Sequence, residues 1–139
     1  MNKRSTALLG IAGVVALAAG LSFNAYAQAD PDPVLFAALM EEGDDVYHTV
    51  GCSGCHANDG TGGNGPSFIG NETLNTAGAV IAQILQPDEE HGTMPAFPNL
   101  TDREIAAVAT YIRNSWGNTY GIAFESSAAF ARRALEGSD

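Results

Sequence analysis

The sequence predicts a small all-α domain with two long loops, and three observations lead to this class. Apolar residues recur at helical spacing in several separate segments, and no segment shows the sustained apolar-polar alternation that is typical of strands. Glycine and proline gather between the helical segments, at 58–70 and at 87–99. With 139 residues the chain is long enough for one modest domain, so we expect about four helices around a single core.

The N-terminal segment has the pattern of a secretory signal peptide. Two basic residues precede an uncharged run rich in Ala, Leu, Val and Gly at 6–23, and an Ala-Tyr-Ala sequence at 25–27 offers the small residues that a signal peptidase recognises. We therefore expect a signal peptide at 1–27, export to the periplasm, and a mature domain at 28–139. The alternative is an uncleaved membrane anchor, because the charge-free span at 5–29 is just long enough to cross a bilayer.

The first helix of the mature domain has clear start signals. Asp32 is a good capping residue, and Pro33 suits the first helical position. Apolar residues at helical spacing continue this helix to Val50. Gly43 either divides it in two or lets a neighbouring backbone approach closely. A second helix is expected at 73–86, because the proline that follows cannot continue it.

The clearest helical signal lies nearer the C-terminus. Thr101 and Glu104 have the spacing of a capping box, and an apolar stripe follows as far as Ile112. Gly117 is a natural stop for this helix, and 126–136 is expected to add a short terminal helix. Two irregular loops of about a dozen residues are uncommon in so small a domain unless a ligand orders them, so a buried cofactor would complete the core.

The balance of charge is strongly acidic. The chain carries 16 acidic residues against 6 basic ones, a formal net charge of −10, and it has no lysine after the expected signal peptide. Such a surface repels nucleic acid and anionic lipid, whose binding depends on basic side chains. We therefore expect no nucleic acid partner, and no membrane unless the leader is retained. Basic partners, or partners that dock through an apolar patch, are favoured, although the acidity can equally serve solubility alone.

Two cysteines lie three positions apart in Cys52-Ser53-Gly54-Cys55-His56. A disulfide here would close a very small loop and stabilise little, whereas Cys-x-x-Cys-His is typical of covalent haem attachment. Two thiols at this spacing, at the end of a helix, can reach the two vinyl groups of a porphyrin, and the next imidazole then lies under the ring. The sequence therefore predicts one covalently bound haem c, with thioethers from Cys52 and Cys55 and with His56 as an iron ligand.

Other uses of the cysteine pair stay open on the residues alone. A thioredoxin-like redox pair needs a βαβ context, which the predicted helices do not provide. A zinc site would draw on both cysteines and on two of His48, His56 and His91, but no second tightly spaced ligand pair accompanies them. The Gly-x-Gly-x-x-Gly pattern at 60–65 does not indicate a dinucleotide site, because no strand precedes it and no helix follows it.

A further iron ligand is expected from the opposite face of the haem. Met94 and Pro95 lie in the second long loop, just before the capped helix. A thioether ligand favours ferrous iron and raises the reduction potential, which suits electron transfer better than oxygen chemistry. Met94 is the predicted ligand and His91 is its competitor. Met40 lies among apolar residues of the first helix, where core packing is the simpler role.

These motifs, in this order, resemble the class I cytochrome c family over nearly the whole of 28–139. The matching segments are Gly43-x-x-Val46-Tyr47, the Cys-x-x-Cys-His motif, Gly65-Pro66, Met94-Pro95-Ala96-Phe97, 100–105 and 111–118. The last segment looks like the cytochrome domains that serve bacterial periplasmic dehydrogenases and copper-containing reductases. Those domains often continue with a short helix that contains alanine and arginine, as 126–136 does.

The resemblance implies a small cytochrome c fold and several residue roles. The first and last helices of that fold would cross closely, with Gly43 fitting against Tyr111. The Pro66 carbonyl would accept a hydrogen bond from the ligand imidazole, which would hold His56 in one tautomer and raise its basicity. On pattern alone, the wall of the haem pocket is expected to contain these side chains: Phe68, Ile69, Leu85, Phe97 and Leu100.

The function that the resemblance implies is electron transfer rather than catalysis. We expect a monomeric periplasmic carrier that takes one electron from a dehydrogenase and passes it to a reductase or terminal oxidase, through the thioether edge near Ser53 and Gly54. Mitochondrial-type members meet acidic partners through a lysine-rich face, which this chain lacks. The alternative is a haem c subunit permanently bound to a larger periplasmic oxidoreductase, with the terminal helix as its docking element. A gas-sensing or catalytic haem protein would need iron with an open sixth site.

Overall fold

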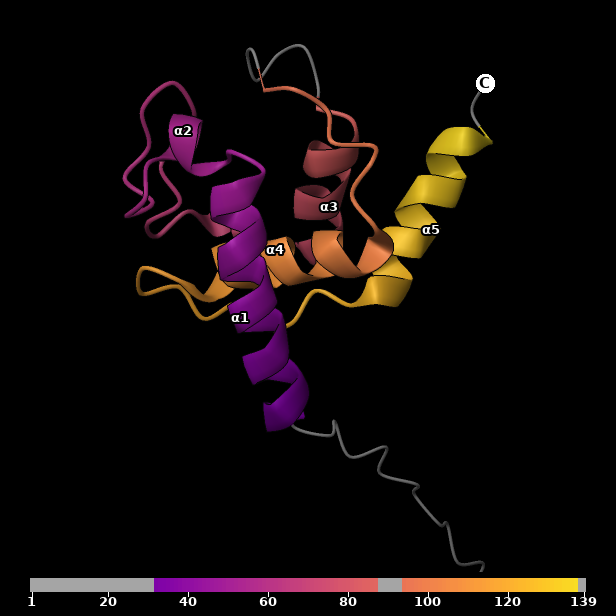
Figure 1. The fold of residues 1–139 in the computed structure, drawn as a ribbon, viewed down its shortest axis with the longest axis horizontal. Coiled ribbons are helices and arrows are strands. Elements are labelled where there is room, and N and C mark those ends of the chain that lie inside the picture. The colour runs from indigo at the N-terminus through magenta and orange to yellow at the C-terminus, as the bar shows by residue number, and fades with distance from the viewer. Residues whose placement is uncertain (1–31, 88–93, 138–139) are drawn as a thin grey trace, which may run out of the picture.

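The computed structural model describes residues 32–87 and 94–137. The helices within these ranges are α1 (Pro33–Thr49), α2 (Ser53–His56), α3 (Ala77–Leu85), α4 (Asp102–Asn114) and α5 (Glu125–Glu136), with one 3₁₀ turn, η1 (Glu72–Asn75). No strand occurs in these ranges, which confirms the predicted all-α class. Figure 1 shows α1 crossing α4, and α3 and α5 pack on α4 and on each other.

Some of the sequence-based predictions fall outside these ranges. The signal peptide expected at 1–27 lies outside the described residues, as does His91. Within the part of the chain that the structure describes, no helix combines the length and apolar character needed to cross a bilayer.

α1 begins as its capping residues predict. The Asp32 Oδ1 atom accepts hydrogen bonds from the backbone N–H groups of Val34 at 2.9 Å and Leu35 at 3.4 Å, and Pro33 occupies the first turn. These bonds satisfy amides that have no partner inside the helix. The helix then continues without a break through Gly43, so this glycine does not divide it.

Gly43 is instead the point at which α1 crosses α4. It is buried, and a Cβ atom added to it would overlap the backbone carbonyl of Ala107 and the Cβ of Tyr111. The two helices therefore approach as closely as a glycine allows, and the contact expected between Gly43 and Tyr111 is confirmed. The other buried residues of α1 are Leu39, Val46 and Tyr47.

α4 is the central helix and starts with the predicted capping box. The Thr101 hydroxyl accepts a hydrogen bond from the Glu104 backbone amide at 3.2 Å, and the Glu104 carboxylate accepts one from the Thr101 amide at 2.7 Å. The bonds from the Thr101 amide and hydroxyl lower the pKa of the Glu104 carboxyl. The helix buries residues on several sides because α1 covers one face while α3 and α5 cover others.

The end of α4 differs from the prediction. The helix ends at Asn114 with the extended residue Ser115 as its C-cap, so the residue just beyond the cap is Trp116 rather than the predicted Gly117. Trp116 then takes a positive φ of 53° and Gly117 one of 89°. Gly117 therefore helps to turn the chain back after the helix, but the turn begins one residue earlier, at a tryptophan.

The start of α3 also differs from the prediction. The helix begins at Ala77, whereas the apolar spacing predicts 73–86. The residues before it form η1 (Glu72–Asn75), which begins where the Asn71 Oδ1 atom accepts a hydrogen bond from the Thr73 amide at 3.0 Å. A short polar side chain that bonds to the backbone two residues later offers the chain a local alternative to the α-helix. The terminal helix expected at 126–136 is present as α5.

The close crossing of α1 and α4 yields a stability prediction. Gly43→Ala should lower the free energy of unfolding by about 1–3 kcal/mol, the usual cost of forcing an extra group into a packed interface. The measurement is the guanidinium unfolding midpoint of the purified protein. Gly78→Ala in α3 is the matched control, because a Cβ there has nothing within 4 Å and alanine favours a helix over glycine. Equal midpoints for the two variants would contradict the close crossing.

Candidate functional site

The cysteine motif forms a turn of its own directly after α1. The sequence predicts it at the end of the first helix, but α1 ends at Thr49 and α2 begins at Ser53. The Cys52 carbonyl accepts hydrogen bonds from the amides of Cys55 at 3.2 Å and His56 at 3.0 Å, which close the turn. The two cysteines form no disulfide, and Cys52 is half-buried while Cys55 is exposed. Burial raises the pKa of the Cys52 thiol.

His56 ends this turn and is buried, with 6% of its surface exposed. Its Nδ1 atom lies 3.0 Å from the Pro66 carbonyl oxygen. Because a carbonyl can only accept a hydrogen bond, Nδ1 must carry the proton and donate it. In this neutral tautomer the free lone pair lies on Nε2. An imidazole in this tautomer can bind a metal through Nε2.

Gly65 packs directly against the His56 ring. A Cβ added to Gly65 would lie 2.5 Å from Cε1 and 2.7 Å from Nδ1 of the imidazole, closer than a real Cβ can approach. The Gly65 amide also donates a hydrogen bond to the Cys55 carbonyl at 3.0 Å. Only a glycine lets the backbone pass this close, so the glycine-rich loop fits around the imidazole.

An apolar cleft adjoins His56 and brings together residues from both long loops and three helices. It is lined by Cys52, His56, Phe68, Ile84, Met94, Phe97, Leu100, Val108 and Ile112. The imidazole and the Met94 side chain, which are far apart in the sequence, thus share one cleft. Cys55 does not line it and stays on the exposed side of its turn.

Three of the five wall residues predicted from the sequence line this cleft, and two do not. Ile69 is 50% exposed, because it follows Phe68 on a non-helical segment whose successive side chains leave the backbone in different directions. Leu85 is buried in the core but does not line the cleft. Its neighbour Ile84 does, because adjacent helix positions face different sides.

The loop that carries Met94 is tied to two helices. Met94 is half-buried and packs against the main apolar cluster. The Phe97 amide donates a hydrogen bond to the Ile84 carbonyl of α3 at 3.0 Å. From α5, the Arg132 guanidinium donates to the Pro98 carbonyl at 2.7 Å. No local sequence pattern indicates this role of Arg132, because its partner lies 34 residues earlier in the chain.

The remaining candidate ligands lie elsewhere. His48 is exposed on α1, where its Nδ1 atom lies 2.8 Å from the Asp44 carbonyl and 3.4 Å from the Asp44 carboxylate. No group of three or more His, Cys, Asp or Glu residues that could hold a metal occurs in the described ranges, so the zinc alternative gains no support there. Met40 is half-buried and belongs to neither apolar cluster, so the core role expected for it is wrong.

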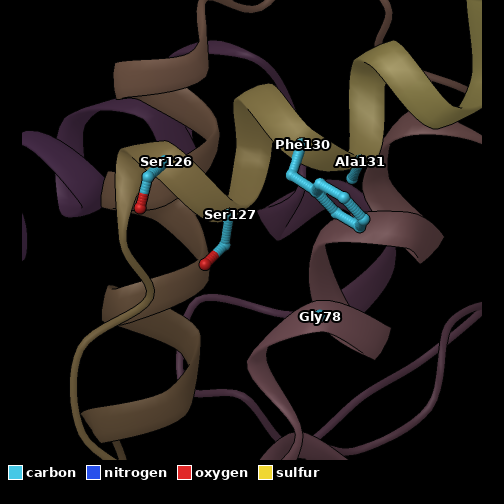
Figure 2. A pocket seen from close by; sticks show the side chains of 5 residues that line it. All are labelled: Gly78, Ser126, Ser127, Phe130 and Ala131. Atoms are coloured by element: carbon cyan, nitrogen blue, oxygen red, sulfur yellow. The ribbon is translucent and has the colours of Figure 1, made fainter.

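A separate hollow of about 400 Å³ lies between α3 and α5 (Figure 2). Figure 2 shows Phe130 of α5 extending toward Gly78 of α3, with Ser126, Ser127 and Ala131 beside it. The hollow has no thiol, imidazole or thioether among its lining side chains. Among the described residues, an imidazole, a thiol and a thioether therefore meet at the cleft beside His56 and not at this hollow.

The residues at that cleft fit a covalently bound haem c. The cysteine turn offers two thiols, the imidazole has its lone pair on Nε2, and a thioether lies in the same cleft. Histidine and methionine are the usual axial ligand pair of electron-transferring c-type haems. The other lining side chains are apolar, as a flat hydrophobic ring requires.

Comparison with known proteins gives the same picture. The family model described as "Cytochrome C oxidase, cbb3-type, subunit III" matches residues 38–112, more than half of the chain. The chain is 37% identical over 93 residues to the fructose dehydrogenase cytochrome subunit of Gluconobacter japonicus, covering 55% of the chain and 19% of that relative. It is 36% identical over 80 residues to the alcohol dehydrogenase (quinone) cytochrome c subunit of Gluconobacter oxydans (strain 621H), covering 48% and 17%. The chain thus spans less than a fifth of each relative's length.

The matched stretch contains every residue that lines the cleft. The same motifs carry the resemblance to class I cytochromes c. Domains of this kind carry covalently bound haem c and transfer electrons. The chain therefore belongs to the family of c-type cytochrome domains described as cbb3-type cytochrome c oxidase subunit III.

Proposed function

We propose that this protein is a periplasmic monohaem electron carrier. The observation that carries the proposal is the cleft that unites the His56 imidazole, in its metal-binding tautomer, with the Met94 thioether. Bound haem c supplies a reversible one-electron change at its iron. The chain has a single Cys-x-x-Cys-His motif, which accounts for one haem.

Each residue of the site has a defined part in this proposal. Cys52 and Cys55 would hold the haem as thioethers, and His56 and Met94 would supply the protein ligands of its iron. The Pro66 carbonyl keeps the proton on Nδ1 of the imidazole, so that the lone pair of Nε2 would be available to bind a metal. The apolar walls exclude water, which together with the thioether ligand favours the less charged ferrous state and raises the potential.

The exposed side of the cysteine turn is the proposed place of electron exchange. Gly54 and Cys55 are exposed there and Ser53 is half-buried. Asp59 lies fully exposed on the following loop. A partner with a basic rim around its own redox centre would meet this edge favourably, because complementary charges steer the encounter.

The names of the relatives favour a dehydrogenase as electron donor. Both are cytochrome subunits of dehydrogenases, one of fructose and one of alcohol. We infer that this chain accepts electrons from a periplasmic dehydrogenase and delivers them to a reductase or terminal oxidase. The same names support a second candidate, in which the chain is a permanent subunit of such an enzyme.

Gel filtration of an extract from the native cell separates these two candidates. For a free carrier, the haem absorbance of this chain elutes at the size of the monomer, apart from dehydrogenase activity. For a permanent subunit, both elute together at a larger size and remain together at high salt. Salt dissociates encounters that depend on charge much more readily than interfaces that bury apolar surface.

Covalent attachment is the first prediction for the site. The intact mass of the purified protein should exceed the polypeptide mass by one haem, and acidic acetone should not extract the pigment. Cys52→Ala or Cys55→Ala leaves one thioether, and the double variant should release its haem to the solvent. Extraction of haem from the wild-type protein would contradict attachment through these cysteines.

The Met94 ligand gives a spectroscopic prediction. Met94→Ala should abolish the absorption band of the methionine-to-iron bond, lower the reduction potential, and let the ferrous protein bind carbon monoxide rapidly. Met40→Ala is the matched control, because Met40 is half-buried on α1 and does not line the cleft. Rapid carbon monoxide binding by the wild-type protein would show an open iron site and overturn the carrier proposal.

The contact between Gly65 and the imidazole gives a third prediction. Gly65→Ala should displace the His56 ring, because a Cβ at this position overlaps it, and so weaken its bond to the iron. The electron paramagnetic resonance spectrum of the ferric protein should then show altered or mixed spin states. Gly54→Ala, where a Cβ meets nothing within 4 Å, should leave that spectrum unchanged. An unaltered spectrum in Gly65→Ala would place the metal-binding imidazole elsewhere.

A further inference from the structure

Side chains at the end of α4 and in the segment that follows it bond to η1 and to the loop beyond the cysteine turn. Arg113, which is 4% exposed, donates hydrogen bonds to the carbonyls of Leu74 at 2.7 Å and Asn75 at 3.0 Å. It also donates to the carbonyls of Tyr120 and Gly121, each at 2.6 Å. Burial lowers the pKa of this guanidinium. One buried side chain thus joins the end of α4 to η1 and to its own following turn.

Asn118 holds the same loop closer to the site. Its side chain is buried, and its Nδ2 atom donates a hydrogen bond to the Phe68 carbonyl at 2.7 Å. Its Oδ1 atom accepts a hydrogen bond from the Gly70 amide at 3.0 Å. Both hydrogen bonds of the Asn118 side chain are therefore made to the backbone between Phe68 and Gly70, and they hold Phe68 in place.

Trp116 lies between Arg113 and Asn118 in the sequence, and its backbone is strained. Its φ of 53° lies in the left-handed region, where a bulky side chain is a rare outlier that the surrounding structure must impose. The six-membered ring of its indole packs against Gly60, where a Cβ would overlap it. The centroids of the Trp116 and Phe68 rings are 5.8 Å apart, with an interplanar angle of 19°. The Trp116 centroid also lies 5.5 Å from the ring centroids of Tyr47 and Tyr111.

Phe68 in turn stacks on His56. The centroids of these two rings are 4.2 Å apart, with an interplanar angle of 17°. The rings of His56, Phe68 and Trp116 thus form a nearly parallel stack. The imidazole is held at its edge by the Pro66 carbonyl and on its face by Phe68, which Trp116 supports from behind.

We propose that Trp116 is a positioning residue for His56, acting through Phe68, with Asn118 holding the backbone between them. The strained turn after α4 places the indole where it limits rotation of the imidazole plane. This inference rests on the proposed function, in which His56 binds the haem iron. Groups that fix the orientation of a ligand ring also tune the metal, so the effect extends to the electronic state of the iron and its potential.

The test compares two substitutions of Trp116 in the haem-loaded protein. Trp116→Leu should shift and broaden the ferric electron paramagnetic resonance g-values, because the imidazole plane is then less restricted, and should lower the reduction potential as water enters. The methionine-to-iron band should stay. Trp116→Phe keeps a flat ring and should return both readouts toward wild type. Phe130→Leu, on the exposed face of α5, is the control and should leave both unchanged.

The outcomes separate a positioning role from a structural one. If Trp116→Leu unfolds more easily but keeps wild-type g-values and potential, Trp116 only stabilises the fold and the inference is overturned. If Trp116→Leu does not fold, Phe68→Leu tests the same stack, and unchanged g-values there overturn the inference equally. A wild-type protein without a low-spin, histidine-ligated spectrum would refute the proposed function itself.

Discussion

The close crossing of α1 and α4 at Gly43 is the contact on which the rest of the structure depends. It places the end of α1, and with it the cysteine turn, beside the end of α4. Tyr47 fills the junction: it is fully buried, and its hydroxyl donates a hydrogen bond to the Ala57 carbonyl at 2.7 Å, directly after His56. Burial raises the pKa of this phenol well above its usual value, so it stays a neutral donor at any physiological pH. A wider separation of the two helices would move His56 away from Phe68 and Trp116, with which it stacks.

The site is therefore built from loops that are held by side-chain bonds to backbone carbonyls. Arg113 is the strongest case, because a buried cation here has four carbonyl partners rather than a carboxylate. Removing it would deprive the carbonyls of Leu74, Asn75 and Tyr120 of this donor at once, while the Gly121 carbonyl keeps the Asn114 side-chain amide, and losing several bonds together costs more than losing any one of them. Arg132 has a corresponding part at the second long loop, where its bond to the Pro98 carbonyl ties α5 to the segment after Met94. Loops without regular structure can position ligands when such residues order them.

Sequence patterns predicted the features that depend on near neighbours. The caps at Asp32 and Thr101 involve atoms two or three residues away, so a short motif contains all the information they need. The 3₁₀ turn at 72–75 was missed because one asparagine side chain overrides a good apolar spacing. The stack on Phe68 depends on a tryptophan far along the chain, in a backbone conformation that tryptophan rarely adopts, and no local pattern indicates it. The roles of the site residues as haem ligands come from motif and resemblance.

The internal use of arginine also shapes the surface that a partner meets. Arg103 pairs with Glu42 at 2.7 Å, Arg132 pairs with Asp102 at 2.9 Å, and Arg113 is buried among carbonyls. In the described residues this leaves Arg133 as the exposed arginine without a carboxylate partner, so acidic side chains dominate the outer surface. Charges on such a surface act over about 8–10 Å at physiological salt, and their effect weakens as salt rises. Arg113 and Arg132, which order the loops around the cleft, thus contribute little free positive charge to the surface.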